Sequence, residues 1–302
     1  MYCYQKQFLS VDQLIKKFED AGMEIDKPNE AKEALLSVGY YRLKGYCFHW
    51  YDKSTHQYKA GTSFSKLIKL YHFDVELSHL IFSYLSEIEV AIRARLVNAF
   101  QLNYNILALN DPSNFDDKKL YWKNQSAVAS EIARSNEVFI KHNFINHEGA
   151  VPLWATVEVM SFGTLSKIIS TLKVENNCVF SELAKHYKYY SQNKNYVVPS
   201  KKMLTSWIQA VSNLRNICAH NSRIYNRSIT VHPEIIAIDK ITPAPRYNGL
   251  YQLMLTMKYL RPTDDSWNDF TEKFDKLLED YLGVYEIKRM NFPEDWQKHF
   301  QI

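Results

Sequence analysis

Arg215 and His220 are the two side chains whose types and spacing best suit acid–base chemistry on a phosphate. Histidine has an unperturbed pKa of about 6.5, so its imidazole accepts and donates protons near neutral pH. Arginine stays protonated, and its planar guanidinium binds two phosphoryl oxygens at once. Asn216, one helical turn before His220, is placed to orient the imidazole or the phosphate. Such a set suits RNA cleavage by attack of the neighbouring 2′-hydroxyl on phosphorus, a reaction that needs no metal-bound water. From spacing alone a structural role is the commoner one, because most arginines and histidines near helix ends are caps, ion-pair members or surface groups.

Side chains that bind phosphate oxygens follow His220 closely in the chain. Arginine and tyrosine donors of this kind contact phosphates and sugars in complexes with nucleic acids. We predict RNA contacts from Arg223, Tyr225 and Arg227. The predicted proton carrier and the predicted RNA anchors thus share one short stretch of chain.

A second stretch with RNA-binding character, Tyr40–Tyr46, lies far earlier in the chain. Aromatic and cationic side chains alternate there, as in surfaces that stack bases and bind the backbone of single-stranded RNA. The predicted RNA-binding residues of this stretch are Tyr41, Arg42 and Lys44. A packed turn whose aromatic rings fill the core is an equally good interpretation. Gly39 and Gly45 bracket the stretch and favour a bent loop or a short extended piece.

An amphipathic helix from Met203 to about His220 is expected to carry the predicted catalytic residues. Its apolar stripe consists of Leu204, Trp207, Ile208, Val211, Leu214 and Cys218. The opposite, polar arc consists of Gln209, Ser212, Asn213, Asn216 and His220. Arg215 departs from this pattern, because it projects beside the apolar stripe, where an unpaired charge costs several kcal/mol. Some other group must therefore pair with it.

The spacing of Arg215 and His220 constrains how they act together. On an ideal helix these positions point about 140° apart. Convergence requires a distorted helix end, an Arg215 side chain that wraps around it, or a second protomer, and we favour a composite site in a homodimer. Glu158, near Ser161, is one candidate partner for Arg215, although a role in helix packing is commoner for such a glutamate.

The remaining pattern predicts an all-α protein. Apolar residues recur at three- and four-residue steps from Leu67 to Phe100, which is typical of a long amphipathic helix, and Glu89 and Arg93 form an i,i+4 pair within it. Further helices are expected over Val11–Ala21, Lys32–Ser37, Pro152–Leu172 and Thr271–Tyr281. Strand-like runs are too few to build an organising sheet.

Composition narrows the classes of protein and site. A chain of 302 residues with 46% hydrophobic content supplies a substantial core, and no Gly/Ser-rich linker divides it. The four cysteines form no C-x-x-C pair and the histidines are scattered, so we predict no metal and no cofactor. An export signal or membrane segment is not expected, which favours the cytoplasm. The net charge of +4 is too small to indicate RNA binding, so any basic surface must be local.

The stretch Leu214–Asn221, followed by Arg223, Tyr225 and Arg227, resembles the signature block of the abortive-infection (Abi) family. This block contains the R-x4-6-H motif of the HEPN superfamily (higher eukaryotes and prokaryotes nucleotide-binding). Other blocks of the resemblance occur in order along the chain: Val38–Tyr46, Phe73–Asp74, Ile88–Arg93, Pro152–Trp154, Glu158–Ser166 and Asn291–Trp296. The resemblance therefore extends over nearly the whole sequence.

The resemblance implies one Abi-like helical domain over residues 1–302. It would comprise an N-terminal subregion (1–62), a HEPN-like helical bundle (63–235) and C-terminal helices with a tail (236–302). It further implies a dimeric, metal-independent endoribonuclease toxin that limits phage propagation, with Arg215, Asn216 and His220 at the motif positions. The implied partners are RNA as substrate and an antitoxin, either RNA or protein.

Two other functions remain compatible with the sequence. One is a non-catalytic RNA-binding or antitoxin-partner module, in which the cations around Arg223 and Tyr40–Tyr46 bind RNA without cutting it. The other is a helical interaction protein in which Arg215 closes a buried ion pair.

Overall fold

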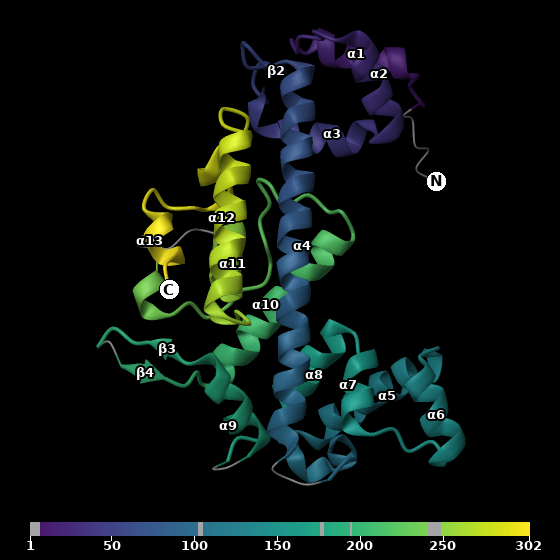
Figure 1. Cartoon of the computed structure of the whole chain (residues 1–302). Helices are drawn as coiled ribbons and strands as arrows, with labels where there is room; N and C mark the ends of the chain where they lie inside the picture. The colour runs from purple at the N-terminus through teal and green to yellow at the C-terminus, as the bar shows by residue number, and fades with distance from the viewer. Residues whose placement is uncertain (1–6, 102–104, 176–177, 194, 241–248) are drawn as a thin grey trace.

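The long helix α4 (Phe64–Phe100) runs through most of the length of the molecule, and the other helices pack around it (Figure 1). The structure is a computed structural model that describes residues 7–101, 105–175, 178–193, 195–240 and 249–302. Within these ranges the helices α1 to α13 provide nearly all regular structure, beside two short hairpins. The predicted all-α helical bundle is confirmed.

The apolar spacing of α4 explains why the other elements gather around it. Ser63 caps the helix, because its side chain accepts a hydrogen bond from the backbone N–H of Lys66 at 3.2 Å. Residues that are 0% exposed recur along the helix: Leu67, Leu70, Phe73, Leu77, Ile81, Leu85, Ile88, Ile92 and Leu96. The helix predicted over Leu67–Phe100 is therefore confirmed, with its start at Phe64.

Three helices and a hairpin surround one end of α4. They are α1 (Val11–Asp20), α2 (Pro28–Ser37), α3 (Tyr40–Cys47), β1 (Tyr51–Asp52) and β2 (Gln57–Tyr58) (Figure 1). The helices predicted over Val11–Ala21 and Lys32–Ser37 correspond to α1 and α2. Short 3-10 turns connect elements here and elsewhere: η1 (Phe48–Trp50), η3 (Ala108–Asn110), η4 (Pro112–Asn114), η5 (Lys185–Tyr187), η6 (Ala237–Asp239) and η7 (Ile287–Met290).

Helix α3 contradicts the bent loop or extended piece predicted between Gly39 and Gly45. Gly39 does bend the chain, with a φ of 90° that favours glycine, but Gly45 lies inside the helix. Leu43, Tyr46 and Cys47 bury one face of α3. This packing outweighs the low helix propensity of glycine.

Four helices gather at the opposite end of α4: α5 (Lys118–Arg134), α6 (Val138–Asn146), α7 (Leu153–Val159) and α8 (Phe162–Thr171) (Figure 1). The prediction of one helix over Pro152–Leu172 was wrong. The backbone is extended at Met160 and Ser161, and the Ser161 side chain caps α8. Arg93 of α4 stabilises the break, because its guanidinium donates to the carbonyls of Val157 and Met160.

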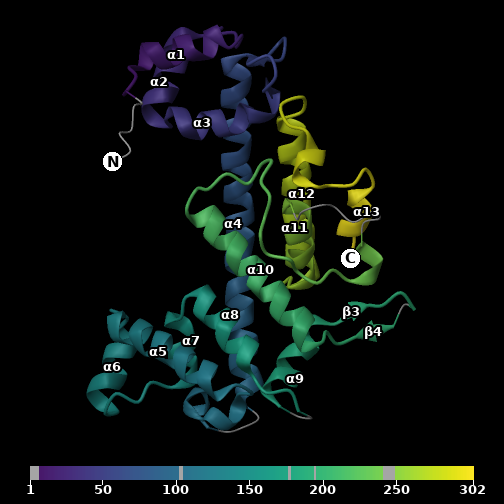
Figure 2. The same cartoon turned by 180° about the vertical axis from the view of Figure 1, so that it is seen from behind.

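Helix α10 (Lys201–Ala219) crosses α4 in the middle of the molecule and packs against α8 and α11 (Figure 2). The other elements of this half are α9 (Val179–Ala184), β3 (Tyr189–Tyr190), β4 (Tyr196–Val197), α11 (Leu250–Tyr259), α12 (Asp264–Asp280) and α13 (Trp296–Phe300). Helix α12 begins earlier than the predicted Thr271 because Thr263 forms a capping box with Ser266. Among the described residues, no helix has the length and apolar character needed to cross a bilayer.

We predict that His49, in η1, contributes to the pH dependence of stability. Its side chain is 4% exposed. Burial, and then repulsion from Arg289, lower the pKa of this imidazole to about 4. An unfolded histidine titrates near pH 6.5, so the unfolded chain takes up a proton first and the folded state loses stability as the pH falls from about 6.5 toward 4.

The free energy of unfolding should therefore decrease less with falling pH in the variant His49→Gln than in the wild type, by on the order of 2 kcal/mol. Urea titrations of both proteins at neutral pH and near pH 4.5 would measure it as the change in the free energy of unfolding. Equal losses in the two proteins would contradict the assignment to His49.

Candidate functional site

His220 stands at the exposed C-terminal end of α10. The helix ends there because Asn221 adopts a left-handed conformation with a φ of 48°. The Asn221 N–H then donates to the carbonyl of Cys218 at 2.9 Å, and the Ser222 N–H donates to that of Ile217 at 3.0 Å. This pair of bonds is a Schellman motif, in which asparagine is a common substitute for glycine. The turn leaves the His220 imidazole facing solvent.

Helix α3 meets the chain just beyond His220, although the two segments are far apart in the sequence. Arg42 donates to the carbonyl of Asn221 at 2.5 Å. In return, Arg223 donates to the carbonyl of Gly45, and its guanidinium lies 5.9 Å from the centre of the Tyr46 ring. The two predicted RNA-binding stretches therefore form one surface next to His220.

This surface includes a shallow pocket of about 360 Å³, lined by Tyr41, Lys44, Gly45, Phe48, Arg223 and Asn226. The Tyr41 ring is 81% exposed, as a base-stacking residue requires, whereas Tyr46 is buried at 1%. The burial of Tyr46 agrees with the interpretation in which aromatic rings fill the core, whereas the RNA contact of Tyr41 stays a prediction. The Lys44 ammonium lies 5.6 Å from the centre of the Tyr40 ring.

A buried carboxylate, Asp74 of α4, fixes the position of this surface. It is 2% exposed and accepts hydrogen bonds from the Tyr46 hydroxyl at 2.6 Å and from the backbone N–H groups of Tyr225 at 2.6 Å and Ile224 at 3.1 Å. Burial raises the pKa of Asp74, while the three donors and the nearby Arg223 charge act in the opposite direction. One side chain thus joins α3, α4 and the segment after α10.

The prediction that Tyr225 contacts RNA does not agree with its position. Its side chain is 0% exposed, and its hydroxyl accepts a hydrogen bond from the Glu286 N–H at 3.1 Å. Tyr225 therefore supports the core. Arg227 is partly exposed and donates to the Arg223 carbonyl at 3.2 Å, so it remains at the edge of the surface.

Arg215 turns toward α4, where Glu89 and Phe82 lie beside it. Its Nε lies 3.5 Å from Oε2 of Glu89, close enough for an ion pair but without the geometry of a hydrogen bond. The guanidinium also lies 5.8 Å from the centre of the Phe82 ring. Glu89 pairs with Arg93 at 2.5 Å as well, which confirms the predicted i,i+4 pair. One glutamate thus faces two arginines, of which Arg215 is the more exposed, at 34% of its side chain.

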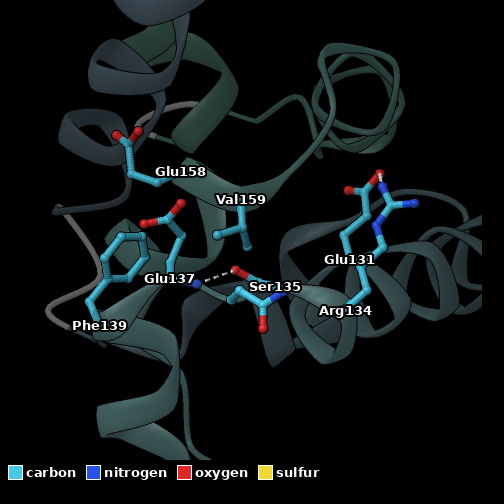
Figure 3. A pocket seen from close by; sticks show the side chains of 8 residues that line it. Glu131, Arg134, Ser135, Glu137, Phe139, Glu158 and Val159 are labelled. Carbon is cyan, nitrogen blue, oxygen red and sulfur yellow. Dashed lines mark hydrogen bonds and ion pairs between the residues drawn. The ribbon is translucent and has the colours of Figure 1, made fainter.

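The alternative partner, Glu158, lies elsewhere. It is exposed and lines a pocket of about 570 Å³ together with Glu131, Arg134 and Glu137 (Figure 3). Ser161, its predicted companion, caps α8 and donates its backbone N–H to Glu131 at 3.0 Å. These contacts assign Ser161 to helix packing.

Arg215 and His220 leave α10 in different directions. Helix α10 stays regular through Ala219, so the predicted angular separation of the two residues is kept. Asn216 is exposed between them. In the structure, His220 therefore lies next to the surface formed with α3, whereas Arg215 lies beside Glu89.

Two positioning residues, Asp74 and Glu89, were not predicted to serve this site. Each is a carboxylate within the buried side of α4. An acidic residue at an apolar position of a helix requires partners, so the same argument that singled out Arg215 would have found both.

The description "Abi-like protein" belongs to a family model that matches residues 33–226, more than half of the sequence. This chain belongs to the Abi-like protein family. Membership points to a role in abortive infection. The matched region includes α3, α4 and α10, and thus every contact made by Asp74 and Glu89 described above. Neither the curated proteins nor the solved structures include a significant match.

We predict that Asp74→Asn destabilises this Abi-like protein by about 2–4 kcal/mol, because an amide has one acceptor oxygen for the three donors and its NH₂ group opposes an N–H. Glu76→Gln is the matched control. Glu76 lies on the same helix and accepts a tyrosine hydroxyl at the same distance of 2.6 Å, but it is exposed.

Urea denaturation would measure both variants. A loss for Asp74→Asn no larger than that for Glu76→Gln would show that the buried carboxylate does not hold the three segments together.

Proposed function

We propose that this Abi-like protein is a metal-independent endoribonuclease that acts in abortive infection. His220 would move the protons and Arg215 would stabilise phosphoryl charge, as the resemblance to HEPN ribonucleases implies. The observation that carries the proposal is the position of His220: an exposed imidazole next to a surface that gathers Arg42, Lys44 and Arg223. RNA held by these cations would place its backbone at the imidazole.

In the proposed reaction, a single imidazole can take up the proton and return it. Neutral His220 accepts the proton of a 2′-hydroxyl as that oxygen forms a bond to the adjacent phosphorus. The bond from phosphorus to the 5′ oxygen breaks, and the imidazolium returns the proton to the departing oxygen. The products are a 2′,3′-cyclic phosphate and a 5′-hydroxyl end.

Arg215 is suited to stabilise the negative charge that develops on the phosphoryl oxygens. Glu89 can neutralise only one of the two arginines it faces, so the cluster of Glu89, Arg93 and Arg215 keeps a net positive charge. Arg93 is buried and its donors are occupied by Glu89, Val157 and Met160. In the described part of the chain the terminal nitrogens of Arg215 have no hydrogen-bond partner, which leaves them free for a phosphate.

A homodimer resolves the separation of the two residues. In our proposal, Arg215 of one protomer faces His220 of the other across a two-fold axis, so each dimer has two composite sites. Asn216 lies between the two on the surface of α10 and would orient the bound phosphate. Restraint of such a toxin by an RNA or protein antitoxin is part of the same proposal.

A second candidate is a non-catalytic RNA-binding module, favoured by the exposed Tyr41 and the cations of α3, which require no chemistry at His220. The two functions predict different effects when the His220 side chain is removed. An enzyme would lose its effect on RNA, whereas a binder would keep its affinity.

We predict that purified wild-type protein cuts RNA to 2′,3′-cyclic phosphate ends in the presence of a chelator. His220→Ala should lower the cleavage rate by about a hundredfold or more, and Arg215→Ala by about the same factor. Mapping of RNA ends, in vitro and after induced expression, would measure this. Matched controls are His79→Ala and Arg134→Ala, which remove exposed side chains of the same types on other helices.

Cleavage that survives in His220→Ala, or that disappears with the chelator, would contradict the proposed mechanism. Absence of cleavage by folded wild-type protein, combined with unchanged RNA affinity in His220→Ala, would leave the binding module as the function.

The composite site predicts complementation between two inactive variants. Co-expression of His220→Ala with Arg215→Ala would give mixed dimers in which one of the two sites is intact. Statistical mixing should then restore about a quarter of the wild-type activity. A mixture as inactive as its components would place both residues in a single protomer.

A further inference from the structure

Helices α8 and α10 pack against each other (Figure 2). The polar arc of α10 lines a groove between them. The groove has a volume of about 290 Å³ and is lined by Gly163, Ser166, Lys167, Ser170, Thr205, Gln209, Ser212, Asn213, Asn216 and Val231. Seven of these ten residues carry a hydroxyl or amide group in the side chain. They differ from the surface at α3, where aromatic and cationic side chains dominate.

Ser212 is unusual among the hydroxyl residues of α10. It is 5% exposed and lines the groove, yet its hydroxyl has no hydrogen-bond partner among the described residues. Other hydroxyls of the same helix donate to backbone carbonyls, Thr205 to Lys201 at 2.8 Å and Ser206 to Met203 at 2.7 Å. Because Ser212 lines the groove, this hydroxyl is available to a ligand that enters it.

Three amides continue this pattern along α10. The side chains of Gln209, Asn213 and Asn216 also have no hydrogen-bond partner within the described ranges. An amide offers donors and an acceptor together, which matches the edges of unpaired bases and the ribose 2′-hydroxyl. Lys167 supplies a positive charge, and none of the described residues that line the groove is a carboxylate that would repel a phosphate.

The groove lies along the polar arc of α10 that also includes His220, the proposed catalytic residue. Of the α10 residues that line the groove, Asn216 is nearest to His220 in the sequence, one turn before it and next to Arg215. From Thr205 to Asn216 the helix rises by about 16 Å, which is enough for a short run of nucleotides. A single strand bound at His220 would therefore continue along α10.

We propose that the groove between α8 and α10 binds the nucleotides that flank the cut phosphate and selects their bases through Gln209, Ser212 and Asn213. This inference rests on the proposed function, since it takes RNA as the ligand and His220 as the reacting group. It assigns sequence preference to uncharged side chains, whereas the cations of α3 hold the backbone irrespective of sequence.

The test uses the full-length His220→Ala protein, which cannot cut the probe. Fluorescence anisotropy would measure its affinity for short single-stranded adenylate, uridylate and cytidylate RNAs. Adding Asn213→Ala should weaken binding of the preferred homopolymer about tenfold and reduce the difference between homopolymers. Asn268→Ala, which removes an exposed amide of α12, is the matched control and should change neither.

Ser212→Ala separates binding from folding. Because the hydroxyl has no partner to lose, this variant should keep or raise the melting temperature while it weakens RNA binding. Unchanged affinities in Asn213→Ala and Ser212→Ala, or RNA affinity too weak to detect in the parent, would overturn the inference. A change in oligomeric state instead of RNA affinity would overturn it as well and assign the groove to a second copy of the chain.

The outcomes distinguish this inference from the proposed function. If the wild-type protein cuts RNA and Asn213→Ala leaves the cleavage sites unchanged, the protein is an endoribonuclease but the groove does not select bases. If RNA binding depends on Asn213 and the wild-type protein cuts no RNA, the groove binds RNA but the protein is not an endoribonuclease.

Discussion

The arrangement of the site depends on one buried carboxylate. Asp74 sits inside the long central helix and takes hydrogen bonds from α3 and from the segment that follows α10. Without an acceptor at this point, the two N–H groups and the tyrosine hydroxyl would be buried without partners, a cost that apolar packing does not offset. Because the donors come from three distant parts of the chain, the carboxylate specifies which segments meet. The exposed end of α10 is then held beside the cations of α3.

Glu89, four turns further along α4, has the corresponding role for Arg215. One face of the same helix therefore positions both groups of the proposed reaction, through one carboxylate each. The two arginines at Glu89 differ in what they do: Arg93 closes the break between α7 and α8, and Arg215 keeps unpaired donors near the surface. The cluster of Glu89, Arg93 and Arg215 therefore contributes both to helix packing and to the proposed reaction. The position of Arg215 depends on the same contacts that stabilise the fold.

The sequence predicted the helices whose apolar periodicity is strong, such as Leu67–Phe100, and it identified Arg215 as a charge that needs a partner. It did not predict the break at Met160, because that break depends on an arginine from another helix. Helix α3 was missed for a related reason: the glycine in it argues locally for a bend, and only the burial of Leu43, Tyr46 and Cys47 outweighs this. The meeting of α3 with the end of α10 depends on Asp74, whose partners lie far away in the chain. Local patterns hold no information on such contacts.

Two arginines connect α3 with the segment after α10, one from each side. Arg42 and Arg223 are held by backbone carbonyls, and neither forms an ion pair in the described part of the molecule. A carbonyl fixes a guanidinium in place without cancelling its charge. The chain carries a net charge of only +4, yet Arg42, Arg223 and Lys44 lie together at one surface, where their field is opposed by the buried Asp74 carboxylate. Such a field raises the rate at which a polyanion encounters the site, and added salt screens it.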